Sequence, residues 1–314
     1  MSIGCVSGIG PEIAPRYETC RIKDRCRSGA VFTKAGQKQP FPPSGIICTF
    51  TSMDLNLQDK HAVVCGSTQG IGKAVALELA LMGATVTLVA RNEERLQQTL
   101  QELSTQAGQE HQYVVADFSR PREVQERLAA HLEKIGQNHI LVNNTGGPAG
   151  GPALDAALEE FENAFAAHLL SNHVLVQAVV PYMQEAQYGR IINIISTSVK
   201  QPIKGLGVSN TIRGAVANWA KTLSFELAPF GITVNNVLPG ATVTARHHSL
   251  IENRMQKTGL SREEIEKEMK AGIPANRFAE PEEVAAAAAF LASPAAGYIT
   301  GINVPVDGGR LGNL

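Results

Sequence analysis

Residues 66 to 72 read Gly-Ser-Thr-Gln-Gly-Ile-Gly and lie between a short apolar run, 62 to 65, and a segment in which Val75, Leu79 and Met82 recur at helical spacing. Glycine lets an anion approach the backbone, and the first N–H groups of a helix attract negative charge. This segment therefore predicts a diphosphate site formed by Gly66, Ser67, Gln69, Gly70, Ile71 and Gly72.

The end of the next apolar run, 84 to 90, indicates which dinucleotide would bind there. An acidic residue at this position would accept hydrogen bonds from an adenosine ribose, whereas a guanidinium pairs with a ribose 2′-phosphate. The chain has Ala90, Arg91 and Asn92 instead of an acid. We therefore expect NADP(H) to be favoured over NAD(H). The alternative is that Arg91 and Asn92 only open the next helix in solvent.

Strand and helix patterns alternate along the rest of the chain. This alternation predicts an α/β fold, a Rossmann-type doubly wound parallel sheet of seven strands in a single domain over residues 53 to 314. The later strands are expected at 113 to 116, 140 to 143, 190 to 195, 232 to 237 and 302 to 306, with long helices at 155 to 184 and 207 to 228.

Several segments together resemble the short-chain dehydrogenase/reductase family, of the type that includes 3-oxoacyl-carrier-protein reductases. The resemblance runs from about Leu55 to Gly309. Besides the glycine loop, it is carried by Asp117, by NNTGG at 143 to 147, by IINIIS at 191 to 196, by ELAPFGITVNNVLPG at 226 to 240 and by VDGG at 306 to 309.

The resemblance implies roles for particular residues. Asp117 would hold the adenine amino group, Asn143 would brace the central strand beside the cofactor, and Ser196 would orient the substrate. Residues 239 to 244 would cover the nicotinamide, through Pro239, Gly240, Thr242 and Thr244. It also implies a homo-oligomer, a tetramer or dimer paired through the two long helices, and a substrate lid at about 244 to 277, where Ser261-Arg-Glu-Glu264 forms a capping box.

The chain departs from the family at the proton donor. The family has a tyrosine thirteen residues after the serine and a lysine four residues later, but this chain has Ser209 and Arg213, with His168 in place of the usual helix asparagine. A phenol with a pKa of about 10, lowered by an ammonium, can protonate an alkoxide, and a serine hydroxyl is a far weaker acid. Arg213 keeps its charge and can hold the nicotinamide ribose.

Two functions remain open. One is an NADP(H)-dependent oxidoreductase that interconverts a carbonyl and an alcohol of a small molecule, a 3-oxoacyl compound among the possible substrates, and uses another acid. His168 and Lys200 are the leading candidates for that acid, with Lys204, His247 and His248 also near the expected site. The other is a pseudoenzyme or sensor that binds NADP(H). Neither the five tyrosines nor any motif supplies the missing phenol.

Composition excludes other classes of function. With 314 residues, 44% hydrophobic content and a formal net charge of −1, the chain has no bulk attraction to nucleic acid or to a membrane surface. We expect no apolar run long enough to span a bilayer and no metal site, because the cysteines lack paired spacing.

The segment 1 to 52 has no helical or strand periodicity and contains Cys5, Cys20, Cys26 and Cys48. We expect it to be a disordered or mis-assigned extension, without the features of a signal or transit peptide. The single cysteine of the domain, Cys65, suits a cytoplasmic location.

Overall fold

The computed structural model describes residues 31–32, 38–39 and 53–313. The chain divides into two units, Met1–Thr51 and Ser52–Leu314. In the first unit, β1 (Val31–Phe32) pairs antiparallel with β2 (Lys38–Gln39). The rest of the predicted extension lies outside the described residues.

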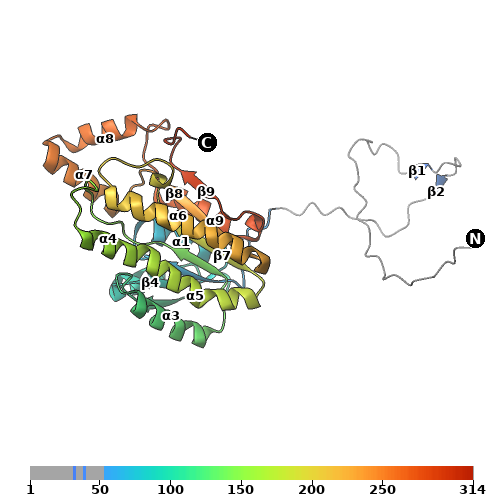
Figure 1. Ribbon diagram of the computed structural model, residues 1–314. Helices are drawn as coiled ribbons and strands as arrows, with labels where there is room; N and C mark the ends of the chain where they lie inside the picture. Colours follow the sequence, from blue (N-terminus) through green and yellow to red (C-terminus); the bar gives the residue numbers. More distant parts are fainter. Residues whose placement is uncertain (1–30, 33–37, 40–52, 314) are drawn as a thin grey trace, which may run out of the picture. The chain divides into compact units, whose positions relative to one another are not determined.

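The second unit is built on one parallel sheet of seven strands in the order β5-β4-β3-β6-β7-β8-β9 (Figure 1). The crossover between β3 and β6 places the two halves of the chain on opposite sides of β3, the doubly wound arrangement that the sequence predicted. The strands are β3 (His61–Cys65), β4 (Thr85–Ala90), β5 (Gln112–Val115), β6 (Ile140–Asn143), β7 (Gly189–Ile194), β8 (Ile232–Pro239) and β9 (Asn303–Val306). The predicted bounds differ from these only at the strand ends.

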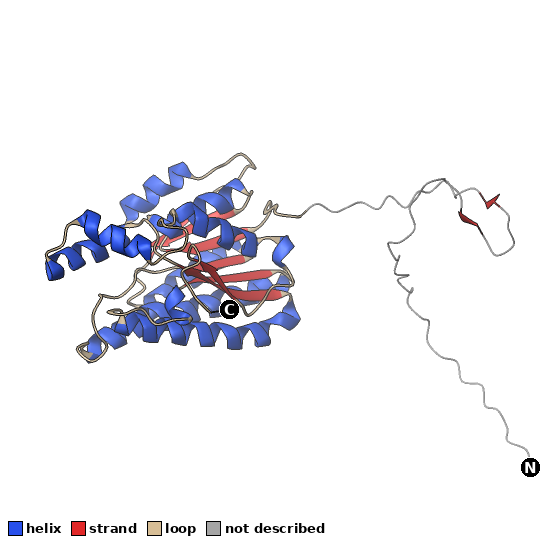
Figure 2. Ribbon diagram, turned by 90° about the horizontal axis from the view of Figure 1, so that it is seen from above, coloured by secondary structure: helices blue, strands red, loops and turns tan. Residues whose placement is uncertain are grey.

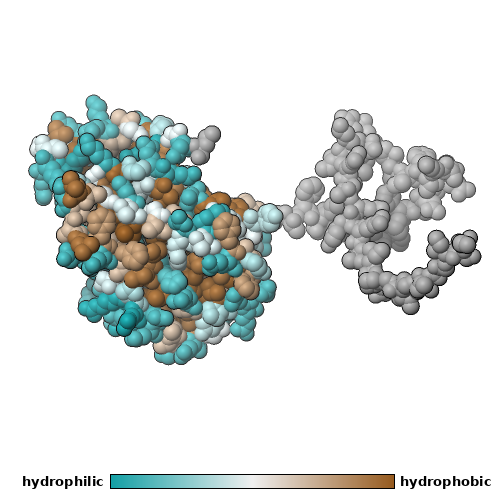
Figure 3. Space-filling model, viewed as in Figure 1, coloured by the Kyte–Doolittle hydropathy of each residue, from teal (hydrophilic) through white to brown (hydrophobic). Residues whose placement is uncertain are grey.

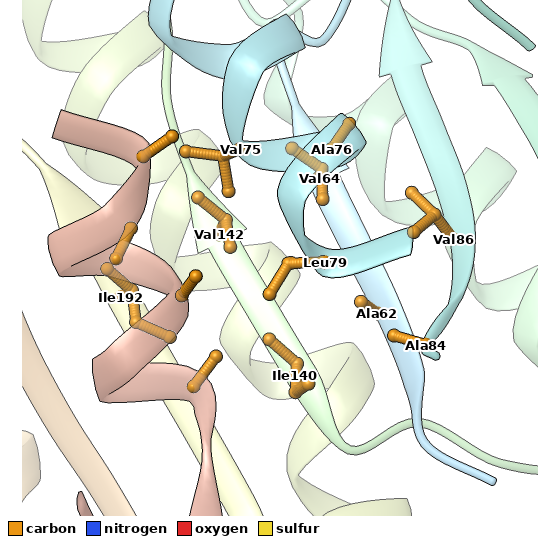
Figure 4. Close-up of a cluster of buried hydrophobic side chains, with 14 of the residues drawn as sticks. Ala62, Val64, Val75, Ala76, Leu79, Ala84, Val86, Ile140, Val142 and Ile192 are labelled. Atoms are coloured by element: carbon orange, nitrogen blue, oxygen red, sulfur yellow. The ribbon is translucent and has the colours of Figure 1, made fainter. Parts of the chain in front are cut away.

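Helices cover both faces of the sheet, which Figure 2 shows as one red layer between blue helices. One face carries α1 (Gly70–Leu81), α2 (Glu93–Glu102) and α9 (Pro281–Ala292), and its core includes Val75 and Leu79 packed against Ile140 and Ile192 (Figure 4). On the other face are α3 (Pro121–Ile135), α5 (Ser171–Glu185) and α6 (Gly207–Leu227), with a second core.

The long helix predicted at 155 to 184 is interrupted. It consists of α4 (Leu158–Phe165), a π-helical turn at Ala166–Leu170 and α5. A π turn accommodates an extra residue per turn and is often found at functional sites. Hydrophobic periodicity could not reveal it, because one extra residue barely changes the apolar pattern. The turn contains His168.

The same stretch, Leu158–Glu185, is long and apolar enough to cross a membrane by length and composition. This corrects the expectation that no segment reaches that threshold. A core helix of a soluble protein passes the same test, and Leu175, Val179 and Met183 are buried in the core beneath α5.

Beyond the layers, α7 (Ala245–Thr258) and α8 (Arg262–Ala271) lie beside the α4 and α6 end of the domain (Figure 1). They occupy the predicted lid segment. The capping box is present: the Ser261 hydroxyl accepts from the Glu264 N–H at 3.2 Å, and the Glu264 carboxylate accepts from the Ser261 N–H at 2.9 Å.

Candidate active site

A cavity of about 1080 Å³ opens at the carboxyl edge of the sheet. Its wall includes the residues that follow five neighbouring strands, namely Gly66 after β3, Arg91 after β4, Asn144 after β6, Ser196 after β7 and Gly240 after β8. Parallel sheets of this kind bind their ligands at this edge. The cavity is therefore the candidate active site.

The glycine loop, where the sequence predicted a diphosphate site, lies along the cavity. Gly66 and Gly70 have φ of +58° and +53°, which favour glycine, and Gly66, Gln69, Gly70 and Ile71 line the wall. No side chain caps the start of α1, where Gln69 is the N-cap residue. The first N–H groups of this helix are thus free of a side-chain partner and suited to a phosphate.

Two predicted residues of this loop lie outside the cavity wall. Gly72 does not line the cavity, and a Cβ there would lie 2.2 Å from the Gly66 carbonyl oxygen, so it permits close packing of α1. The Ser67 side chain is buried and its hydroxyl accepts a 3.1 Å hydrogen bond from the Val89 N–H of β4. Ser67 therefore ties the glycine loop to β4, because its hydroxyl is hydrogen bonded to a strand N–H.

Arg91 and Asn92 both line the cavity, at the end of β4. The Asn92 side chain caps α2 by accepting from the Arg95 N–H at 2.8 Å. Arg95, which the sequence did not indicate, lines the same wall and donates to the Gln69 side chain at 3.2 Å. Two guanidiniums thus stand where a ribose 2′-phosphate would be recognised.

Asp117 lies after β5 but outside the cavity wall, where Phe118 takes its place. Its carboxylate accepts from the Ser119 N–H at 3.0 Å. Burial raises the pKa of Asp117, but the hydrogen bonds from Ser119 and the charges of Arg91 and Arg120 outweigh it, so the net pKa is lowered. Asp117 therefore remains an ionised acceptor near Arg91.

Asn143 is also behind the wall, and its neighbour Asn144 lines the cavity. Asn143 belongs to a row of amides across β6, β7, β8 and β9, buried on the first three strands and half-buried on β9. It donates to Asn193 at 2.8 Å, Asn193 donates to Asn236 at 2.9 Å, and Asn236 donates to Asn303 at 2.8 Å. Strand register places these side chains opposite one another. The row holds four strands in register beneath the cavity.

The predicted cover residues, Pro239, Gly240, Thr242 and Thr244, all line the cavity. Thr244 caps α7, because its hydroxyl accepts from the His247 N–H at 3.2 Å, and its methyl lies 3.1 Å from where a Cβ on Gly70 would stand. From α7 and α8, Leu250 and Met269 complete an apolar part of the wall.

Ser196, Ser209 and Arg213 all line the cavity. The Ser196 hydroxyl accepts from the Ser198 N–H at 3.1 Å. Arg213 is buried and donates to the Ile194 carbonyl oxygen at 3.2 Å. Burial, followed by the charge of Arg246, lowers the pKa of Arg213 to about 10. It is still a cation at neutral pH.

His168 is buried and lies outside the wall, with its Nδ1 hydrogen bonded to the Thr145 hydroxyl. Burial and then the charge of Arg213 lower its pKa to about 2. The imidazole is therefore neutral at pH 7. This argues against His168 as the acid, because burial and the charge of Arg213 both disfavour the imidazolium.

The two lysines of the loop between Ser196 and Ser209 separate in the fold. Both side chains are exposed, but Lys204 lines the cavity and Lys200 does not. His247 lines it too, with a buried Nε2 that has no hydrogen-bond partner and a pKa lowered by burial. His248 lies outside, facing Arg262. No tyrosine is among the described residues of the wall.

The charged side chains of the wall, in the described part of the chain, are all cationic. They are Arg91, Arg95, Lys204, Arg213, Arg246, Arg254, Lys257 and Arg310. Residues 53 to 313 contain no cluster of three histidine, cysteine or acidic side chains that could hold a metal ion. The chemistry of the cavity is thus that of an anion-binding, hydroxyl-bearing site.

Comparisons with known proteins agree with this geometry. Residues 66–310 match the family model described as enoyl-(acyl carrier protein) reductase. The chain is 30% identical over 259 residues to the NADPH-dependent reductase BacG of Bacillus subtilis (strain 168), covering 82% of this chain and 100% of the relative. It is 35% identical over 254 residues to a putative ketoacyl reductase of Streptomyces coelicolor, covering 80% and 97%.

Solved structures give the same result. L-sorbose reductase from Gluconobacter frateurii, in complex with NADPH and L-sorbose, superposes with a TM-score of 0.78 at 30% identity, covering 83% of this chain and all of that one. These relatives share the fold and the extent of the domain.

Proposed function

The chain belongs to the short-chain dehydrogenase/reductase family of oxidoreductases, and from that membership we propose an NADP(H)-dependent enzyme that interconverts a carbonyl and an alcohol with a non-standard proton donor. The observation that carries the proposal is that Ser196, Ser209 and Arg213 line the same cavity as the glycine loop. The proposal that the substrate is a 3-oxoacyl compound rests on the ketoacyl reductase among the relatives.

The cavity fits NADP(H). The uncapped start of α1 would hold the diphosphate, and Arg91 with Arg95 would hold the 2′-phosphate. Thr242 and Thr244 would face the nicotinamide side from the cover. When bound, the cofactor supplies the hydride that reduces the carbonyl carbon.

The protein must then stabilise and protonate the carbonyl oxygen. As the C–O π electrons move to that oxygen, negative charge develops on it. A hydrogen bond from the Ser196 hydroxyl and the positive charge of Arg213 stabilise this negative charge. The proton that completes the alcohol comes from another group. Lys204 is a proton-bearing group of the wall, on the loop that joins the two serines. We assign it this role in place of Lys200 and His168.

A second function, an NADP(H)-binding protein without turnover, is favoured by a specific observation. The described wall has no tyrosine, and His168 is held neutral. A protein that binds NADPH tightly and reduces no carbonyl would fit this alternative.

The test pairs NADPH binding with a reductase screen over oxoacyl, sugar and steroid carbonyls. For any substrate found, Lys204→Met should lower kcat by about 10²-fold or more, the usual contribution of a general acid. Lys200→Met is the matched control, the same change on the same loop outside the wall, and should leave kcat unchanged. Equal rates in both variants would contradict the role of Lys204, and tight NADPH binding without any turnover would favour the binding protein.

The remaining proposals concern assembly and location. Apolar side chains are exposed on the face of α4, α5 and α6, including Phe165 on α4, Leu170 in the π turn and Phe225 on α6. Figure 3 shows brown side chains gathered over this part of the surface. We propose that this face is covered in a homo-oligomer.

Cys65, buried and in the thiol form, is compatible with the proposed cytoplasmic location.

A further inference from the structure

The cations of the cavity exceed what a dinucleotide requires. Arg91 and Arg95 stand at the end of β4 and start of α2, where the 2′-phosphate is expected, and backbone N–H groups serve the diphosphate. The rest come from other elements, including the loop before α6, α6 itself, α7 and the C-terminal segment. They are Lys204, Arg213, Arg246, Arg254, Lys257 and Arg310.

Arg246 has no acidic partner among the described residues, although its neighbours on the lid do. Arg254 pairs with Glu268 at 2.6 Å, and Arg262 lies within ion-pair distance of Glu252 and Glu266. Arg246 is half-buried and forms no ion pair in residues 53 to 313. A counter-ion stabilises a partly desolvated charge, and the cavity gives an anion access to Arg246.

The position of Arg246 is fixed by the loop after β6. Its Nη2 donates to the Pro148 carbonyl oxygen, and its Nε lies 3.6 Å from where a Cβ on Gly147 would stand. Gly146 and Gly147 both line the cavity, and a Cβ on Gly146 would meet nothing within 4 Å. The guanidinium is therefore held in the cavity wall beside Gly147.

Arg213 on α6 and Arg246 on α7 both line this cavity with like charges. They are close enough for the charge of Arg246 to lower the pKa of Arg213, after the larger effect of burial. Two guanidiniums in one partly desolvated cavity repel each other. An anion bound between them would be attracted to both and would offset this repulsion.

We propose that Arg246 is a specificity-determining residue that anchors an anionic group of the substrate, so that the substrate class is an anionic oxo compound. This inference rests on the proposed function for the carbonyl. The anionic group is a carboxylate or a phosphate, because a guanidinium can donate to two oxygens of either group.

The kinetic test uses substrates matched in the carbonyl and different in charge, an oxo acid against its methyl ester and a sugar phosphate against the free sugar. The anionic member should have a kcat/KM about 10- to 100-fold higher, as expected for a charged hydrogen-bonded pair, and rising salt should reduce this preference. Preference for the oxo acid identifies a carboxylate, and preference for the sugar phosphate identifies a phosphate.

Arg246→Gln should abolish the preference while leaving the reduction of the neutral member and NADPH affinity within about twofold. Arg262→Gln is the matched control, since it removes the same charge from the lid outside the cavity wall. A wild-type protein that reduces neutral and anionic members equally well would overturn the proposal. So would a loss of NADPH affinity in Arg246→Gln, which would assign this guanidinium to the cofactor phosphates.

A binding test of the anion site does not depend on turnover. Malonate and inorganic phosphate are titrated by calorimetry into the NADPH-saturated protein and its variants. Binding by the wild type and Arg262→Gln, lost in Arg246→Gln, would support the anion site even if no carbonyl were reduced. Absence of binding by both anions would overturn it, whatever the reductase screen gives.

Discussion

Arg213 donates a 3.2 Å hydrogen bond to the carbonyl oxygen of Ile194 and so ties the second turn of α6 to the end of β7, just before Ser196. Ser209 lies four residues earlier on the same helix, and residues at this spacing share a helix face. Both line the cavity with Ser196. Ser209 and Arg213 thus lie on the cavity side of α6.

The double substitution Ser209→Tyr with Arg213→Lys should increase carbonyl reduction by about 10²- to 10⁴-fold, because it restores a phenol whose pKa an ammonium can lower. Initial rates of NADPH oxidation measure the change. Ser209→Phe with Arg213→Lys is the matched control, with the ring but no hydroxyl, and should gain nothing. Equal rates in the two double variants would mean that the phenol is not the missing group.

Arg91→Ala should weaken NADPH binding by about 10- to 100-fold and leave NADH within about twofold, since only NADPH has a 2′-phosphate. Dissociation constants by fluorescence titration decide the question. Arg127→Ala, at an exposed position on α3 where Arg127 pairs with Glu123, controls for the loss of a surface charge. Similar weakening of both cofactors would show that Arg91 has a structural role.

His168 should make the protein less stable as the pH falls below about 6.5. Its pKa in the folded protein is about 2, so the unfolded chain takes up the proton first, and acid favours unfolding. At pH 5 this lowers the free energy of unfolding by about 2 kcal/mol relative to neutral pH. Denaturant unfolding of the wild type and His168→Asn at pH 7 and pH 5 should show a smaller acid loss in the variant, and identical losses would refute the assignment.

A chain that begins at Met53 should keep the melting temperature and NADPH affinity of the full chain. The unit Ser52–Leu314 contains the seven-stranded sheet and the cavity wall. Differential scanning calorimetry and a binding titration test this. A loss of several degrees in melting temperature would show that residues 1 to 52 contribute to the fold.

Light scattering at micromolar concentration should give a mass that is a multiple of the chain mass. Phe225 on α6 is 69% exposed, and burying it against a second copy would remove its apolar surface from water. Phe225→Glu should therefore shift the mass toward the monomer, whereas Phe290→Glu, on α9 of the other face, should not. A monomeric wild type would contradict the proposed assembly.

The sequence by itself determined the elements and the cofactor end of the site. The spacing of Gly66, Gly70 and the apolar residues of α1 follows from local backbone requirements, and the alternation of strands and helices restricts the sheet to a parallel order. Arg91 was identifiable because its position after β4 is fixed by a contiguous strand. The absence of a tyrosine before Arg213 was visible because the spacing from Ser196 can be counted in the sequence.

Only the tertiary structure decided what each remaining side chain faces. Ser67 and Asn143 turn into the protein, because an N–H of a neighbouring strand and a row of amides capture them. Lys204 lines the cavity and Lys200 does not, although both lie in one loop. Arg246 is fixed by Pro148, far away in the chain. Such contacts depend on distances between elements that periodicity does not encode, and burial, which sets the pKa of His168, exists only once those elements have packed.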